Sequence, residues 1–225
     1  MKHTNVALFV PDEGCPHRCS FCNQKTISGF QKRLEPIDVI SACETALGGE
    51  KDLSQAEIAF FGGSFTAIEK GYMLSLLKTA KSYLDRGFFK GIRISTRPDC
   101  IDEGVLLLLK EYGVTSIELG CQSMDDTVLA LNGRGHTAKD SENACRLIKS
   151  FGFELGVQMM TGLYGDTDEK AIETAKKLIS LSPDTVRIYP TVVLKNTELE
   201  KLYESREYKA QTLEEAVSLC SKLLK

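Results

Sequence analysis

The sequence predicts an α/β fold, namely a partial (β/α)6 barrel of parallel strands. Three observations predict it: six short apolar runs of strand length, segments of helical periodicity between them, and a spacing of roughly 37 residues per unit, which suits right-handed crossovers. A complete eight-unit barrel needs about 250 residues, and the chain has 225. An open six-stranded barrel is therefore favoured, and a doubly wound flat sheet is the alternative.

The predicted strands are mostly continuous apolar runs, as expected for parallel strands that are buried on both faces. They are Asn5–Pro11, Glu57–Gly62, Gly91–Thr96, Ser116–Gln122, Glu154–Met160 and Thr185–Tyr189.

Between these runs the apolar period changes to 3.6 residues, which indicates amphipathic helices. One apolar face combines Tyr72, Met73, Leu76, Leu77, Ala80, Tyr83 and Leu84. Capping signals predict three further helices: one from Asp102 to Gly113, one from Thr137 to Gly152, and a last one that begins at Thr212. Thr137 with Asp140 and Thr212 with Glu215 have the spacing of capping boxes.

The composition fits one globular domain over residues 1–225. The chain is 42% hydrophobic and 26% charged, and no Pro/Gly/Ser linker, repeat or low-complexity stretch divides it. The last helix has no clear stop signal, which leaves open a continuation beyond residue 225. The net charge of -3 gives no general attraction for phosphates, so a nucleic-acid partner would need a local basic patch or another domain.

The N-terminal apolar run is too short for a secretory signal, and no membrane span is indicated, so we expect a cytoplasmic protein. In a reducing compartment, the eight cysteines are better candidates for metal ligation, catalysis or burial than for disulfides.

Three of these cysteines, Cys15, Cys19 and Cys22, lie in a CxxxCxxC loop directly after the first predicted strand. Fully stretched, this segment would span roughly 23 Å, so the backbone must curl if the three sulfurs are to meet one metal centre. Gly14 and Pro16 permit such a curl. Three converging thiolates indicate a soft metal, and a chance group of three unpaired thiols is the less favoured alternative.

Two kinds of metal centre fit this loop. A structural zinc ion needs four ligands, which His17 would complete as a Cys3His set, although CxHxCxxC is not a usual zinc spacing. A 4Fe-4S cubane is normally held by four cysteines, so three would leave one iron open to another ligand.

At this point the sequence resembles a known family. CxxxCxxC with Phe21 before the last cysteine resembles the cluster loop of the radical S-adenosylmethionine (SAM) enzymes, and Phe61-Gly62-Gly63-Ser64-Phe65 resembles their glycine motif after the second strand. Four further stretches resemble, in order, the radical domain of the Elongator catalytic subunit, whose acetyltransferase domain this chain lacks. They are Ser95–Asp99, Ile117–Ser123, Asn132–Thr137 and Arg187–Thr191.

The resemblance implies a 4Fe-4S cluster on Cys15, Cys19 and Cys22, with SAM on the open iron. It also implies an external low-potential electron donor and a 5'-deoxyadenosyl radical that abstracts hydrogen from a substrate. The chemistry belongs to the cofactor, so the protein holds it, aims it and excludes water.

The resemblance further assigns residues to the cofactor. The implied SAM contacts are Phe21, Gly62, Gly63, Ser64, Ser95, Gln122, Arg134, Gln158 and Tyr189. Gly62 and Gly63 would approach the methionine amine, and Arg134 would pair with its carboxylate. Gln122 would bond ribose or carboxylate oxygens, and Gln158 stands where relatives carry a ribose-binding side chain. Phe21 and the Ile188-Tyr189 strand end would flank the adenine. In two places the chain departs from relatives: it has no carboxylate near Ser95, and it has neutral Gln158 where many relatives are acidic.

The remaining cysteines and histidines have plain structural interpretations. Cys43, Cys121, Cys145 and Cys220 are expected in the core, His17 and His136 in loops, and His3 at a frayed terminus. Cys100, after Pro98, is the one other cysteine considered for the site, and no auxiliary cluster is expected.

The substrate stays open between a tRNA base, which the Elongator resemblance implies, and a small molecule of porphyrin type. Basic stretches such as Lys25–Arg33 and Lys78–Lys90 are interpreted as solvated faces. A zinc-binding module without catalysis and a simple electron carrier are the alternatives outside this enzyme class.

Overall fold

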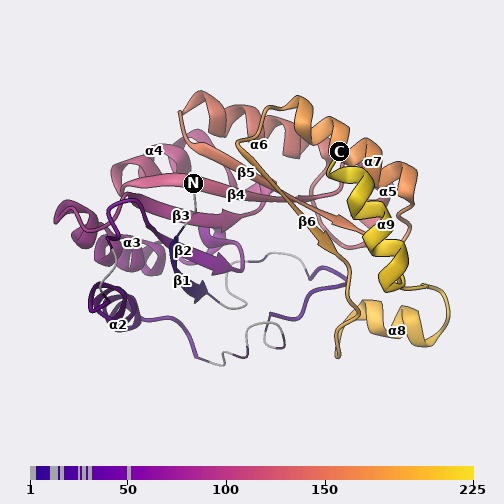
Figure 1. The fold of residues 1–225 in the computed structure, drawn as a ribbon, viewed down its shortest axis with the longest axis horizontal. Coiled ribbons are helices and arrows are strands. Elements are labelled where there is room, and N and C mark those ends of the chain that lie inside the picture. The colour runs from indigo at the N-terminus through magenta and orange to yellow at the C-terminus, as the bar shows by residue number, and fades with distance from the viewer. Residues whose placement is uncertain are drawn as a thin grey trace.

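The structure is a computed structural model of the 225-residue chain, and it describes residues 4–10, 15, 18–24, 26, 29, 32–49 and 52–225. Six parallel strands form one sheet in sequential order, β1-β2-β3-β4-β5-β6. The sheet curls and the connecting helices lie along its outer side (Figure 1). A doubly wound sheet reverses its strand order at a switch point, so the sequential order rules out the flat alternative and confirms the partial barrel.

The strand predictions hold within a few residues. The observed strands are β1 (Asn5–Val10), β2 (Glu57–Gly62), β3 (Gly91–Thr96), β4 (Val114–Gln122), β5 (Glu154–Thr161) and β6 (Thr185–Pro190). Pro11, the predicted end of the first strand, lies outside the described residues. β4 begins two residues earlier than predicted because Val114 and Thr115 continue its extended backbone.

The helices connect and flank these strands. They are α2 (Pro36–Leu47), α3 (Lys70–Asp85), α4 (Glu103–Glu111), α5 (Asp126–Leu131), α6 (Ala138–Ser150), α7 (Asp168–Ser180), α8 (Glu198–Glu204) and α9 (Leu213–Leu223), with short 3-10 turns η1 (Phe65–Ala67) and η2 (Pro98–Cys100).

The capping signals act as predicted. Asp102 accepts a hydrogen bond from the backbone of Val105 at the start of α4, and Gly113, with φ +81°, lies just past its end. Thr137 and Thr212 begin α6 and α9 with complete capping boxes. These side chains use backbone N–H groups that a helix leaves unpaired at its first turn.

The core lies between the sheet and the helices, and it contains most of the predicted apolar positions. Tyr72, Met73, Leu76, Leu77, Ala80 and Tyr83 of α3 are buried there, together with Cys43, Cys121 and Cys145. Cys220 differs from expectation, since α9 leaves it half-buried at the surface of the fold.

The inner face of the sheet contains charged residues, contrary to the expectation of continuously apolar strands. Arg93 of β3, 3% exposed in its side chain, donates to the carboxylates of Glu57, Glu118 and Glu154 over 2.7, 2.6 and 2.7 Å. Arg187 of β6 also lies 3.1 Å from Glu118. Five strand residues thus form an ion network inside the curled sheet, because the concave face of a half-barrel has no second apolar layer to pack against.

Hydrogen bonds maintain the charges of this network. Burial opposes ionisation of Glu57, but bonds from Ser116, Thr115 and Arg93 outweigh it and hold the pKa of Glu57 below its ordinary value. Because the folded-state pKa is depressed, this carboxylate stabilises the fold above its ordinary pKa, and that stabilisation is lost as the pH falls through the folded-state pKa.

We expect Arg93→Met to lower the free energy of unfolding at pH 7 by about 3 to 5 kcal/mol, because it leaves buried carboxylates without a counter-charge. The difference from the parent protein should shrink on acidification below pH 4.5, where the carboxyls become protonated. Urea unfolding at a series of pH values measures both effects.

Lys81→Met is the matched control, since Lys81 pairs with Asp85 on the surface of α3 and such exposed pairs contribute at most about 1 kcal/mol. Equal losses of stability in the two variants would show that the internal network does not support the fold.

Candidate functional site

The predicted site residues gather at the carboxyl ends of the parallel strands. This is the edge where parallel barrels place their functional loops. The CxxxCxxC loop follows β1, the Gly62-Gly63-Ser64 turn follows β2, and Gln122 ends β4. Residues 132–136 form the loop between α5 and α6.

Within the cysteine loop, the described part curls as the sequence required. The backbone N–H of Cys22 donates to the carbonyl of Cys19 over 3.1 Å, which closes a turn between these two residues. Cys15 is exposed as a residue, yet desolvation raises the pKa of its thiol. The negative charge of Cys19 adds to that rise, whereas the Ser64 backbone and two arginines oppose it. The thiols of Cys15 and Cys19 are therefore electrostatic neighbours.

In the part of the chain that the structure describes, no three His, Cys, Asp or Glu side chains are close enough to hold one metal ion. A single zinc ion needs such a close group. A cubane instead takes one thiolate at each of three irons. His17, the fourth ligand of the zinc hypothesis, lies outside the described residues, so the cubane and the zinc ion both stay predictions.

Asn132, which the sequence analysis did not single out, fixes this loop in place. Its side chain is fully buried and accepts a 2.7 Å bond from the Ser20 hydroxyl, and its amide donates to the carbonyls of Val128 and Tyr164. The backbone N–H of Ser20 donates to the Asn132 carbonyl over 3.0 Å. One side chain thus joins the cysteine loop to the loops that follow β4 and β5.

The C-terminal segment holds the same loop from its other side. The backbone N–H of Leu199, in α8, donates to the Ser20 carbonyl over 2.8 Å, and the Asn23 amide donates to the carbonyl of Lys195 over 3.0 Å. All three polar groups of Ser20 are therefore used in long-range bonds, which position Cys19 and Cys22 on either side of it.

The glycine turn lies directly against the end of β1. Gly62 has φ +114°, and a Cβ there would come within 2.6 Å of the Val10 carbonyl and 2.9 Å of the Phe9 ring. The Gly63 backbone donates to the same Val10 carbonyl, and the Gln24 amide links the Gly62 carbonyl to the Cys22 sulfur. The backbone of Gly62 is accordingly held beside the cysteine loop, where the resemblance places it.

The Ser64 side chain links two loops of the site. Its hydroxyl lies 3.0 Å from that of Thr96 and accepts a 3.3 Å bond from the Arg97 backbone, so it connects the loops after β2 and β3. Ser95, the residue that replaces the usual carboxylate, is half-buried. Cys100 is half-buried too, and its thiol is near the Ser64 hydroxyl and the Cys15 thiol; burial is the main cause of its raised pKa.

Arg134 and Gln122 converge as predicted. Arg134, 6% exposed, donates to the Cys19 sulfur over 3.2 Å and to the Gly120 carbonyl over 2.5 Å. A Cβ on Gly120 would stand 3.1 Å from the Gln122 amide nitrogen and 3.4 Å from Arg134 Nη2, so this glycine makes room for both side chains. The register of β4 shifts between Gly120 and Gln122, and Gln122 has a φ of +64°. This bulge turns Gln122 toward Arg134.

Two buried atoms of this pair are unsatisfied among the described residues: Arg134 Nε and Gln122 Oε1. Buried polar atoms without partners are rare and call for an explanation. One donor and one acceptor beside a cysteine sulfur fit a ligand that carries both carboxylate and hydroxyl groups. The methionine and ribose parts of SAM have these groups.

The other predicted contacts border the same region. Gln158 of β5 is half-buried and lies in register between Gly120 and Arg187, and Tyr189, 42% exposed, is the last residue but one of β6. Phe21 is half-buried in the cysteine loop. His136 lies in a loop as expected but is buried, and its pKa falls to about 4 because of burial and the charge of Arg134.

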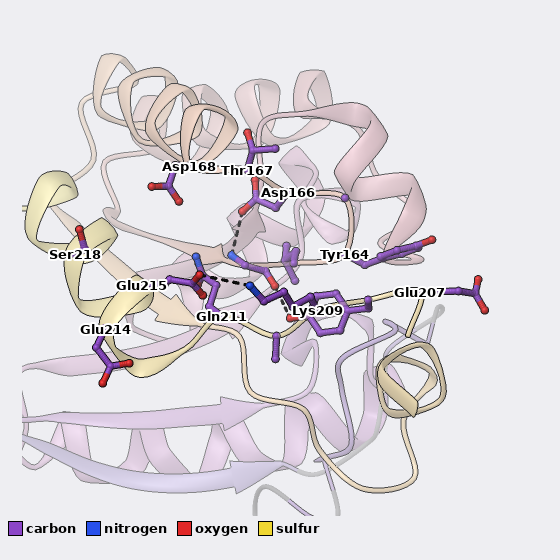
Figure 2. Close-up of a pocket in the computed structure, with 15 residues that line it drawn as sticks. Tyr164, Asp166, Thr167, Asp168, Glu207, Lys209, Gln211, Glu214, Glu215 and Ser218 are labelled. Carbon is purple, nitrogen blue, oxygen red and sulfur yellow. Dashed lines mark hydrogen bonds and ion pairs between the residues drawn. The ribbon is translucent and has the colours of Figure 1, made fainter. Parts of the chain in front are cut away.

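A separate cavity of about 780 Å³ opens between the loop after β5 and the segment before α9 (Figure 2). Asp166, Glu214 and Glu215 are among its lining residues, and Lys209 pairs with Glu215. None of the predicted site residues lines it. This cavity is therefore distinct from the region of the predicted cofactor contacts.

In the part of the chain described, no helix is long and apolar enough to cross a membrane.

Comparisons with known proteins show which family the chain belongs to. The family model of the Radical SAM superfamily matches residues 9–178, and that of the Radical SAM C-terminal domain matches residues 183–225. The tRNA uridine(34) acetyltransferase of Methanocaldococcus infernus is 25% identical over 256 residues, covering 96% of this chain and 48% of the relative. Elongator complex protein 3 of Mus musculus is 29% identical over 192 residues, covering 76% and 35%.

The solved structure of the Methanocaldococcus infernus Elp3 has the same fold, with a TM-score of 0.78 at 24% identity, covering 99% of this chain and 54% of that one. The chain thus spans about half the length of the Methanocaldococcus infernus relative and 35% of the mouse relative. Because one family model covers most of the chain and the three cysteines lie where that family's cluster loop is expected, the chain belongs to the radical SAM superfamily of enzymes.

Proposed function

We propose that this enzyme holds a 4Fe-4S cluster on Cys15, Cys19 and Cys22, binds SAM at the open iron, and acts on a base of tRNA. The observation that supports the cofactor assignment most directly is the pair of unsatisfied buried atoms, Arg134 Nε and Gln122 Oε1, beside the Cys19 sulfur. When bound, the two cofactors supply a carbon radical that removes a hydrogen atom from the substrate.

The protein's own residues bind SAM and orient it. Arg134 Nε donates to the methionine carboxylate, while the Gln122 side chain bonds a ribose or carboxylate oxygen. Gly62 and Gly63 let the backbone approach the methionine amine, since a Cβ at Gly62 would already collide with Val10. Gln158, Tyr189 near the carboxyl end of β6, and Phe21 in the cysteine loop would hold the adenosine part of SAM. Together these residues exclude water from the reacting carbon.

The tRNA assignment is supported by the similarity to a tRNA uridine(34) acetyltransferase and to Elongator complex protein 3. Since the chain matches about half of the first relative and 35% of the second, acetyl transfer is not part of the proposal. An external low-potential donor supplies the electron. A reduced cluster suits the reducing cytoplasm, where we place the protein, and we treat residues 1–225 as one functional unit.

Replacing any one of Cys15, Cys19 or Cys22 by Ala should remove the cluster and SAM cleavage together, because two thiolates do not hold a cubane firmly. The reconstituted parent should be brown, with about four irons per chain, and should release 5'-deoxyadenosine from SAM after dithionite reduction.

Cys220→Ala on α9 is the matched control and should keep both iron and cleavage. Full cleavage in a cluster-loop variant would refute the ligand assignment. A colourless, zinc-containing parent would support the zinc module, and a brown parent that releases no 5'-deoxyadenosine would be an electron carrier.

Arg134→Ala should keep the iron and weaken SAM binding by about 1 to 3 kcal/mol, the usual value of a charge-assisted hydrogen bond. Equilibrium binding of SAM to the reconstituted protein measures the change, and iron analysis of the same sample checks the cluster. Arg134→Lys, which keeps the charge without the forked geometry, should lose less. An unchanged affinity in the Ala variant would exclude the carboxylate role of Arg134.

Unmodified tRNA should increase the rate of 5'-deoxyadenosine release severalfold over the substrate-free rate. The same assay with a porphyrinogen distinguishes the small-molecule alternative: stimulation by the porphyrinogen and not by tRNA would overturn the substrate assignment.

A further inference from the structure

Arg97, directly after β3, is a buried cation that none of the cofactor contacts above employs. Its side chain is 4% exposed. Its Nε and Nη2 donate to the two carboxylate oxygens of Asp99 over 2.9 and 3.0 Å, and Nη2 also donates to the carbonyl of Arg134. The remaining nitrogen, Nη1, lies 4.0 Å from the Cys19 sulfur.

This arrangement orients the ion pair. Asp99 accepts from one side of the guanidinium, so the group presents its other side to Cys19. A forked, bidentate pair of this kind fixes direction as well as distance. The buried, positive end of the ion pair therefore points at one of the three predicted cluster ligands.

The other neighbours of Cys19 do not cancel this charge. Arg134 Nη1 lies 3.2 Å from the same sulfur and adds a second positive charge. His136 Nδ1 lies 4.0 Å from Asp99, but burial keeps that imidazole neutral at pH 7. Among the described residues, Asp99 is the carboxylate paired with Arg97, and it stands on the side away from the sulfur.

Charge at this position affects a cluster more than charge at the surface. A cubane on three thiolates gains one further negative charge when it takes up an electron, and its potential depends on nearby charges and on hydrogen bonds to its sulfurs. Because Arg97 is buried, solvent screens its interaction with Cys19 only weakly. A positive charge there favours the reduced state.

We propose that Arg97 is a positioning residue that raises the reduction potential of the cluster through Cys19, and that Asp99 sets its orientation. The inference rests on the proposed cluster at Cys15, Cys19 and Cys22. The step concerned is uptake of one electron from a low-potential donor, with no bond made or broken.

The test is a potentiometric titration of the anaerobically reconstituted protein with dithionite, followed by electron paramagnetic resonance in the absence of SAM. We expect Arg97→Gln to shift the midpoint potential to a more negative value and Asp99→Asn to shift it to a more positive value. Arg97→Lys should stay near the parent. Arg146→Gln on α6, 68% exposed, is the matched control and should not shift.

A loaded Arg97→Gln protein with the parent's potential would overturn the inference, as would a negative shift in Asp99→Asn. If Arg97→Gln does not hold the cluster, the midpoint potentials of Asp99→Asn and Arg97→Lys test the inference instead. Loss of the cluster from both of those would show a purely structural role and would also overturn the inference. A parent protein that binds no cluster at all would instead refute the proposed function.

Discussion

The hydrogen bonds between Ser20 and Asn132 are the contacts on which the site depends. Three cysteines within eight residues can meet one cluster only if their loop is held in a fixed curl. The described part of that loop is fixed by the buried Asn132 amide and by the backbone of Leu199. The amide of Asn132 also reaches the loop after β5. Segments far apart in the sequence therefore set the position of Cys19 and Cys22, and a short loop with little core of its own gains a defined geometry.

The curled sheet supplies the second constraint. Its concave face is lined by Glu57, Arg93, Glu118, Glu154 and Arg187. Paired charges can be buried there, whereas unpaired ones could not. Above this layer, Gly120 leaves space in which Arg134 and Gln122 approach the cysteine loop. The same arrangement that keeps the inner face of the half-barrel polar thus leaves a protected region at the strand ends.

The sequence was sufficient to predict the strands, several helices and the position of the cysteine loop, Gly62 and Gln122 at the strand ends, because these features depend on local periodicity, capping and loop position. It did not reveal Asn132 or Arg97. Their importance arises from contacts between Asn132 and Ser20, 112 residues apart, and between Arg97 and Cys19, 78 residues apart. No local pattern encodes such pairs. One sequence feature does indicate the charged inner face, because each of five consecutive strands contains a Glu or an Arg. The strands were predicted from their apolar runs, so this feature was not used.

The central claim is that three protein thiolates leave one iron free for the amine and carboxylate of SAM. Electron-nuclear double resonance on the reduced, reconstituted protein with SAM labelled with ¹⁵N at its amine tests this most directly. The account predicts a ¹⁵N coupling to the cluster that disappears when unlabelled SAM is used. A reduced cluster whose spectrum is unchanged by saturating SAM and shows no such coupling would contradict it.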